Sequence, residues 1–138
     1  MGTGDRGSTN WGKILQSSYG DVLEFVGLCD INRKRMAVAR DYIGVNCPMF
    51  MATEFDEMIR KTSPDRVIVT TIDSFHAKYI CRALELGVNV ISEKPMATDE
   101  KMVQEVLDMQ RRTGRELIIT ENYRYTPDAE AIKKIIDS

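Results

Sequence analysis

Glu93 and Lys94 are the residues whose types and position point most directly to chemistry. The apolar run at residues 88–91 predicts a buried strand, which Pro95 must end because proline cannot donate to a sheet ladder. An acid–base pair therefore stands at the carboxyl end of a strand, just before a forced turn. In open α/β sheets, that edge is where ligands bind. A lysine chosen at random is a solvated surface residue, so it is the position of Lys94 that predicts a functional role.

A glycine-rich start supplies a second candidate site. Gly2, Gly4 and Gly7 fit the pattern G-x-G-x-x-G, and apolar residues at helical spacing follow them over residues 11–19. Glycines that open a helix let the backbone approach a pyrophosphate, which the helix N-terminus then stabilises. Taken alone, the motif fits a flexible, glycine-rich terminus equally well.

Asp30 strengthens the glycine motif. It ends a predicted strand at residues 23–29 and lies about twenty residues beyond the glycines, where an acidic residue can accept from a ribose 2′-OH. Asp30 could also cap the next predicted helix, residues 33–43, and the two roles are compatible. The carboxylate would repel a 2′-phosphate, which favours NAD over NADP, although Arg33 nearby weakens that preference.

Two further strands end at the same predicted edge. Residues 66–71 form an apolar run typical of a strand buried on both faces, and Asp73 is expected to cap the helix that follows. His76 lies in the first turn of that helix, where packing is favoured somewhat over catalysis. Residues 116–120 predict another strand, which delivers the polar segment 121–125 to this edge.

Composition limits the classes of function. The chain has 138 residues, 43% of them apolar and 29% charged, with a net charge of −2, as in one ordinary globular domain. Nothing in this balance indicates nucleic acid or an anionic membrane as a partner. Cys29, Cys47 and Cys81 are odd in number and lack paired spacing, and there is one histidine, so we expect no disulfide framework and no metal site. These features favour the reduced cytoplasm.

The predicted strands and helices alternate along the chain without internal repeats. Helix starts are expected at Thr53, which opens a capping-box-like sequence, at Thr98, and at Thr126 before Pro127. Alternation of this kind indicates βαβ units and a parallel sheet with helices on both faces. Together with the glycine loop and Asp30, it predicts a Rossmann-type, doubly wound α/β fold.

Five segments in order carry a family resemblance: Gly-Thr-Gly-Asp-Arg-Gly, Cys-Asp-Ile-Asn, Val-Thr-Thr-Ile-Asp-Ser-Phe-His, Ser-Glu-Lys-Pro-Met-Ala and Glu-Asn-Tyr-Arg-Tyr-Thr-Pro. With them the chain resembles the Gfo/Idh/MocA oxidoreductases, the glucose–fructose oxidoreductase and inositol dehydrogenase family. The match covers nearly the whole chain, and Glu-Lys-Pro is its specific part. The resemblance implies NAD(P)-dependent hydride transfer on a sugar or cyclitol hydroxyl.

The resemblance also implies roles for individual residues. Gly2, Gly4, Asp5 and Arg6 would form the pyrophosphate loop, and Asp30 would contact the ribose. The other implied cofactor contacts are Thr71, Ile72, His76, Glu93, Lys94 and Asn122. Lys94 would be the catalytic residue that reaches the reacting hydroxyl, and the Lys94–Pro95 bond would be cis, as in many members.

Three departures from the family pattern shape our expectations. Ile72 stands where the family usually has proline, which loosens that loop. The family has a central strand before the glycine loop, and without it the flanking strands would lie about 10 Å apart with unpaired backbone groups. We therefore expect residues 1–124 to form an NAD(P)-binding domain lacking its first strand. The third departure is that the chain stops where the family begins its second domain, which holds most of the substrate pocket and a homo-oligomer interface. Residues 125–138 would connect to that domain, and this chain alone would be inactive.

Other functions remain open. The same family contains NAD-dependent glycosidases, in which transient oxidation of the sugar lets the aglycone leave; net NADH release would mark a dehydrogenase, and sugar release without it a glycosidase. A non-catalytic dinucleotide-binding fragment is a third possibility. A flavodoxin-like signalling domain is a distant fourth, because Asp30 and Asp73 alone make a poor acidic cluster.

Overall fold

The computed structural model describes residues 1–138 and contains five strands, all paired in parallel. Two of them form one pair, β1–β2, and three form a sheet in the order β3–β4–β5. The strands are β1 (Leu28–Asp30), β2 (Met49–Met51), β3 (Arg66–Val69), β4 (Asn89–Glu93) and β5 (Leu117–Thr120). Because the strands are parallel, their carboxyl ends meet at one edge.

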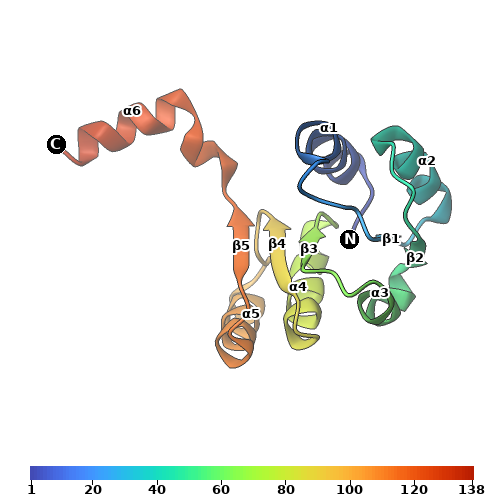
Figure 1. Ribbon diagram of the computed structural model, residues 1–138. Helices are drawn as coiled ribbons and strands as arrows, with labels where there is room; N and C mark the ends of the chain where they lie inside the picture. Colours follow the sequence, from blue (N-terminus) through green and yellow to red (C-terminus); the bar gives the residue numbers. More distant parts are fainter.

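Helices cover both sides of these strands (Figure 1). α1 and α2 lie on one side, α3, α4 and α5 lie on the other, and α6 extends away from the rest. The α-helices are α1 (Ile14–Tyr19), α2 (Arg33–Ile43), α3 (Phe55–Thr62), α4 (His76–Glu85), α5 (Glu100–Thr113) and α6 (Pro127–Ile136). Shorter or differently wound segments are η1 (Arg6–Lys13), η2 (Ala52–Glu54), η3 (Asp73–Phe75) and η4 (Asn122–Tyr125). The predicted doubly wound α/β fold is confirmed, and none of the helices is long and apolar enough to cross a bilayer.

Met1 and Gly2 join the two groups of strands. The Gly2 N–H donates to Cys29 O of β1 at 2.8 Å. On the other side, the Met1 ammonium donates to Ile68 O of β3 at 2.6 Å, and the Thr70 N–H donates to Met1 O at 2.8 Å. These two residues therefore occupy the position between β1 and β3 at the carboxyl edge.

The predicted strand at residues 23–29 is wrong over most of its length. The strand begins only at Leu28, and residues 23–27 have no regular secondary structure and belong to no ladder. A strand needs a hydrogen-bonded neighbour, and β2 reaches only from Met49 to Met51. On the other side of β1, the neighbour is Gly2, whose N–H donates a hydrogen bond to Cys29 O at the carboxyl end of the strand.

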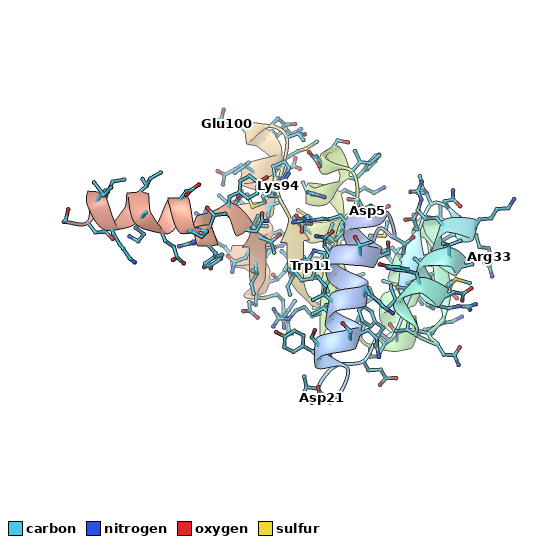
Figure 2. The ribbon with its side chains drawn as sticks, turned by 90° about the horizontal axis from the view of Figure 1, so that it is seen from above. Asp5, Trp11, Asp21, Arg33, Lys94 and Glu100 are labelled. Carbon is cyan, nitrogen blue, oxygen red and sulfur yellow. The ribbon has the colours of Figure 1, made fainter.

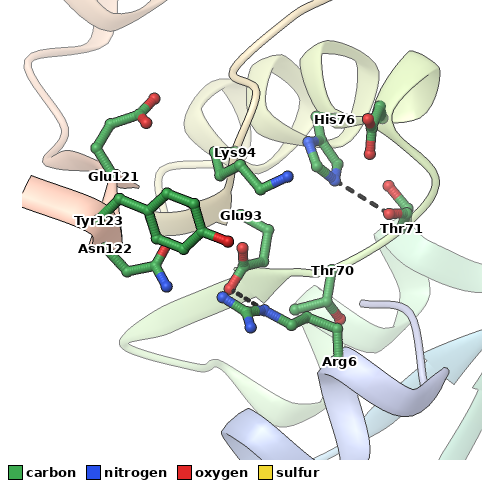
Figure 3. A pocket seen from close by; sticks show the side chains of 10 residues that line it. Arg6, Thr70, Thr71, His76, Glu93, Lys94, Glu121, Asn122 and Tyr123 are labelled. Carbon is green, nitrogen blue, oxygen red and sulfur yellow. Dashed lines mark hydrogen bonds and ion pairs between the residues drawn. The ribbon is translucent and has the colours of Figure 1, made fainter. Parts of the chain in front are cut away.

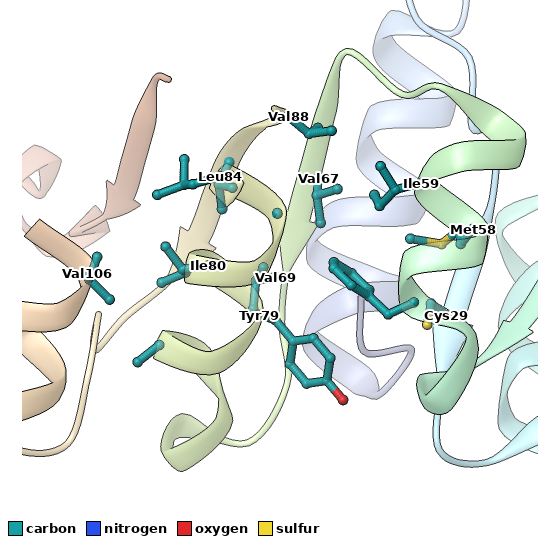
Figure 4. Close-up of a cluster of buried hydrophobic side chains, with 14 of the residues drawn as sticks. Cys29, Met58, Ile59, Val67, Val69, Tyr79, Ile80, Leu84, Val88 and Val106 are labelled. Carbon is teal, nitrogen blue, oxygen red and sulfur yellow. The ribbon is translucent and has the colours of Figure 1, made fainter. Parts of the chain in front are cut away.

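The hydrophobic core lies between the strands and α3, α4 and α5 (Figure 4). Val69 of β3 and Val90 of β4 are fully buried, as are Ile80 and Leu84 of α4. Each such side chain stabilises the fold by about 1.5–3 kcal/mol. The core therefore fixes the strands whose ends form the polar edge.

Several helix starts differ from the prediction. Asp99, not Thr98, caps α5, because its carboxylate accepts from the Met102 N–H at 2.8 Å. Asp73 makes no capping hydrogen bond. Before α3, it is the Glu54 carboxylate that accepts, from the Met51 N–H at 2.6 Å, so the box opens at Met51, two residues ahead of the predicted Thr53. Residues that can cap a helix stand next to or near each other at these starts. The sequence pattern alone could not tell which of them makes the capping hydrogen bond.

The first helix starts earlier than predicted and is wound differently. The apolar pattern predicted it over residues 11–19, whereas η1 begins at Arg6 and is a π-helix. Two of its glycines lie against neighbouring backbone and side chains: a Cβ on Gly7 would stand 2.2 Å from Gly2 O, and one on Gly12 would stand 2.4 Å from Ile43 Cδ1. Close packing of this kind explains why η1 begins among glycines.

The glycines of the loop differ in what surrounds them. Gly2 has a φ of +91°, and a Cβ there would lie 2.6 Å from Thr70 O. Gly4 has no atom within 4 Å of a built Cβ. Gly2 is thus required by the fold, whereas Gly4 leaves the backbone open to the surroundings.

We predict that Gly2→Ala destabilises the domain by about 2–4 kcal/mol, because it adds left-handed strain to a clash with backbone. Gly4→Ala is the matched control and should change the free energy of unfolding by no more than about 0.5 kcal/mol. Urea denaturation followed by far-UV circular dichroism measures both. Equal effects of the two substitutions would contradict this account of the loop.

Candidate functional site

A cavity of about 490 Å³ opens at the carboxyl ends of β3, β4 and β5 (Figure 3). Residues from η1, from the loops after β3 and β4, and from the segment after β5 face it. Its lining is almost entirely polar: Arg6, Thr70, Thr71, Asp73, His76, Glu93, Lys94, Glu121, Asn122 and Tyr123. A cavity is thus present at the carboxyl ends of the strands, the edge at which ligand binding was predicted.

Lys94 carries the free cation of this cavity. It follows the last residue of β4, and the peptide bond to Pro95 is cis, as the resemblance implied. The ammonium makes no hydrogen bond and no ion pair, and the residue is exposed. Figure 3 shows the side chain extending between His76 and Tyr123. An unpaired ammonium at this place can donate a proton or a hydrogen bond to a bound molecule.

Glu93 is the buried anion beside Lys94. Its Oε1 accepts hydrogen bonds from Arg6 Nε and Trp11 Nε1, each at 2.8 Å. Burial opposes ionisation of the carboxyl group, but the hydrogen bonds from Arg6 and Trp11 outweigh it and lower the pKa of Glu93 below its usual value. The carboxylate is therefore ionised at neutral pH and engaged within the protein.

His76 connects two of the loops that line the cavity. The ring is buried, with Nδ1 2.7 Å from Pro95 O and Nε2 3.1 Å from Thr71 O. Both ring nitrogens thus face backbone carbonyls, one after β4 and one after β3. This contact holds the Lys94–Pro95 turn against the Thr71 loop, as expected for a packing residue at a helix start.

Asp30 holds the glycine loop to β1. Its Oδ2 accepts from the Thr3 N–H at 2.6 Å and from the Thr3 hydroxyl at 2.9 Å, and its Oδ1 accepts from the Asn32 N–H at 2.9 Å. The residue is buried. Burial alone would raise the pKa of Asp30, but these hydrogen bonds and Arg35 lower it below its usual value. The helix cap is Asn32, which accepts from the Arg35 N–H, so Asp30 does not cap α2.

A second cavity of about 380 Å³ lies on the other side of the glycine loop, between that loop and α2. Its lining includes Thr3, Gly4 and Asp5 from the loop and Arg35 and Tyr42 from α2. The guanidinium of Arg35 stands 3.9 Å from Asp30 and is half exposed. The segment at residues 3–6 therefore separates the polar first cavity from a second one with a mixed lining. Figure 2 shows Asp5 at the start of the helix that leaves this loop.

The predicted site residues fall into three groups. Six line the first cavity: Arg6, Thr71, His76, Glu93, Lys94 and Asn122. Gly4 and Asp5 line the second. Gly2, Asp30 and Ile72 line neither; Gly2 and Asp30 hold the loop, and the Ile72 side chain is exposed.

The sequence did not identify several residues of the site. Thr70, Asp73, Glu121 and Tyr123 also line the first cavity, and Trp11 bonds to Glu93. Thr70 and Glu121 could have been predicted, because each stands directly after a strand. Trp11 had none, because its apolar spacing indicated only a helix face.

We predict that Asp30→Asn destabilises the domain by about 1–3 kcal/mol, because both carboxylate oxygens accept from N–H groups and an amide would turn one acceptor into a donor. The wild-type contribution is complete above the usual pKa of 3.8 and is lost as the pH falls through the lower folded-state pKa. Chemical denaturation at pH 7 and below pH 4 measures both effects.

Asp99→Asn is the control for this substitution. Asp99 caps α5 through one oxygen, and asparagine caps equally well, so the change should stay within about 0.5 kcal/mol. A stability of Asp30→Asn equal to that of the wild type would contradict the anchoring role of Asp30.

Relatives of this chain were found by sequence and by structure. YteT of Bacillus subtilis, provisionally named an oxidoreductase, is 35% identical over 126 residues, which are 90% of this chain and 29% of YteT. Glycosyl hydrolase family 109 protein 1 of Akkermansia muciniphila is 30% identical over 91% of this chain and 27% of its own length. The chain thus spans less than a third of these two relatives.

Among solved structures, the WlbA dehydrogenase of Bordetella pertussis in complex with NADH and UDP-GlcNAcA aligns with a TM-score of 0.85 at 25% identity. The alignment covers 99% of this chain and 39% of that one. KijD10, a 3-ketoreductase of Actinomadura kijaniata in complex with NADP, has the same fold, with a TM-score of 0.79 at 20% identity over 99% of this chain and 42% of that one.

The family comparison covers nearly the entire chain. Residues 1–121 match the model described as "Oxidoreductase family, NAD-binding Rossmann fold". This match agrees with the parallel sheet, the glycine loop and the polar edge described above. The chain therefore belongs to the Gfo/Idh/MocA oxidoreductase family and contains its NAD-binding domain.

Proposed function

We propose that this chain is the cofactor-binding part of an NAD(P)-dependent oxidoreductase that transfers a hydride between nicotinamide and a sugar or cyclitol hydroxyl. The observation that carries the proposal is the unpaired ammonium of Lys94 in a polar cavity next to the glycine loop. A polar cavity with one free cation suits a substrate bearing hydroxyl groups.

The residues around the loop fit a dinucleotide. Gly4 leaves space above the backbone, which is what a pyrophosphate requires of the loop before a helix. The cavities on either side of the loop would take the two halves of the molecule, with nicotinamide by Lys94 and adenosine by Arg35. When bound, the nicotinamide would supply the hydride acceptor or donor.

Lys94 would act on the oxygen of the reacting hydroxyl. Its ammonium is free to donate a hydrogen bond to that oxygen, and the neighbouring residues limit its position: His76 holds the Pro95 carbonyl, and Glu93 is fixed by Arg6. Thr71 and Asn122 would line the groove for the nicotinamide, and Ile72 would border it. Lys94 is the catalytic residue of this proposal.

NAD is the cofactor favoured by the charge of Asp30. Its carboxylate would repel a 2′-phosphate, but Arg35 lies 3.9 Å from it and lines the adenosine-side cavity, so NADP remains acceptable. Because Asp30 is engaged with Thr3, we propose that it contacts the ribose through Oδ1, which has one short hydrogen bond, to the Asn32 N–H.

Two relatives support the proposal of a sugar-like substrate. WlbA was crystallised with UDP-GlcNAcA, and an inositol 2-dehydrogenase of Klebsiella pneumoniae is 27% identical over 138 residues, which are 40% of its length. These are properties of those proteins; for this chain, they support a polyhydroxylated substrate.

Residues 125–138 would connect the domain at residues 1–124 to a second domain. α6 exposes Ile132, Ile135 and Ile136, with 58%, 74% and 76% of their surfaces accessible. Three adjacent exposed isoleucines are unusual on a free helix and suit one that contacts further protein. We propose that this further part completes the substrate pocket and mediates homo-oligomer formation.

We predict that Lys94→Met, in a longer protein that contains this domain, abolishes turnover and changes the Kd for NADH by less than about twofold, because the side chain acts on substrate rather than on cofactor. Calorimetric titration gives the Kd, and absorbance at 340 nm gives turnover. Lys101→Met, on the exposed face of α5, is the matched control and should keep wild-type turnover. Wild-type turnover in Lys94→Met would refute the catalytic role.

A glycosidase is the second candidate, supported by the 30% identity to the family 109 protein. The proton and hydride steps at Lys94 would be the same, but oxidation would be transient. Sugar release from a glycoside without net NADH would favour the glycosidase, and net NADH from a free sugar or cyclitol would favour the dehydrogenase.

A further inference from the structure

Glu93 contacts the first helical segment at two points. Its Oε1 accepts from Arg6 Nε and from Trp11 Nε1, both at 2.8 Å, and only 7% of its side chain is exposed. Arg6 and Trp11 both belong to η1, whereas Glu93 ends β4 and precedes Lys94. One buried oxygen thus joins the helix after the glycine loop to the strand that presents Lys94.

The π-helical winding of η1 allows this double contact. In a π-helix the repeating hydrogen bond joins residues i and i+5, so Arg6 and Trp11 lie about one turn apart on the same face. In an α-helix, side chains five positions apart would point about 140° away from each other. Glu93 could then reach only one of the two.

We propose that Glu93 is a positioning residue that acts through Arg6 and Trp11, holding η1 and the glycine loop in fixed register with Lys94. The proposal rests on the proposed function, because it concerns how the same cofactor site is held. In this proposal, the Arg6 Nε–H donates to Glu93, whereas the resemblance implied that Arg6 contacts the pyrophosphate.

The electrostatics agree with this geometry. Hydrogen bonds from Arg6 and Trp11 keep the pKa of Glu93 low in spite of burial, so the ion pair with Arg6 exists throughout the neutral range. The Arg6 side chain is 41% exposed, which leaves the guanidinium at the wall of the first cavity.

The contact can be tested without any cofactor, because Trp11 is the one tryptophan of the chain. We expect Glu93→Ala to shift the Trp11 emission to longer wavelength and to increase its quenching by acrylamide. Glu93→Gln keeps an acceptor oxygen and should resemble the wild type at pH 7. Acidification through the pKa of Glu93 should alter the emission of the wild type more than that of Glu93→Gln, in which Asp30 still titrates but residue 93 does not.

Glu116→Gln is the matched control, since Glu116 forms an exposed ion pair with Arg66 away from the cavity. It should leave the Trp11 emission unchanged. Emission and quenching of Glu93→Ala equal to those of the wild type, with the far-UV spectrum intact, would overturn the proposal.

A double-mutant cycle on the affinity for NADH then tests positioning of the cofactor loop. We expect Arg6→Gln and Glu93→Ala each to weaken NADH binding by about three- to tenfold, and the double variant to be no weaker than the worse single variant. Additive losses, or unchanged or tighter binding in Glu93→Ala, would overturn the proposal and leave Arg6 as an independent phosphate ligand.

The two proposals fail in different ways. If the wild-type chain does not bind NADH, the proposed function fails. The Trp11 emission of the cofactor-free variants still decides whether Glu93 holds η1.

Discussion

The backbone pairing of Met1 and Gly2 with strands on both sides is the constraint on which the site depends. Gly2 bonds to β1, and Met1 bonds to Ile68 of β3 and to Thr70 just after it, so the glycine loop starts at a fixed point between the two groups of strands. Asp30 then fixes the next residue, Thr3, through two hydrogen bonds. The position of the loop is thus set by backbone geometry and one buried carboxylate before any ligand arrives.

From this fixed point, contacts continue to the strand ends at which Lys94 lies. η1 leaves the loop and meets Glu93, the last residue of β4. Lys94 follows Glu93 directly, and His76 contacts both the Pro95 carbonyl and the loop after β3. Each contact is short and made by a buried or half-buried group, so the elements around Lys94 form one connected arrangement. By contrast, the segment at residues 121–125 is exposed and forms the outer wall of the cavity.

The sequence predicted the elements well where periodicity and position decide the outcome. The alternation of strands and helices gave the fold class, and Pro95 correctly ended β4 next to Glu93 and Lys94. It failed over residues 23–27, because a ladder depends on neighbours that an apolar pattern does not reveal. It also missed the link from Trp11 to Glu93, since a contact between residues so far apart in the chain leaves no local signal. The sequence did not predict that Asp30 accepts hydrogen bonds from Thr3, because its spacing suggested a ribose contact, which stays a prediction, and a helix cap, which is wrong.

The three loop glycines differ in whether the surrounding protein leaves room for a side chain. Side chains at Gly2 and Gly7 would strike backbone atoms of the protein itself, whereas a side chain at Gly4 would meet nothing in the domain. We therefore expect selection for folding to act on the first and third glycines, and selection for the proposed dinucleotide contact to act on the second. In a lineage that kept this domain but abandoned its dinucleotide, Gly4 would be free to drift while Gly2 and Gly7 stayed, so variation at this one position would record the loss of binding.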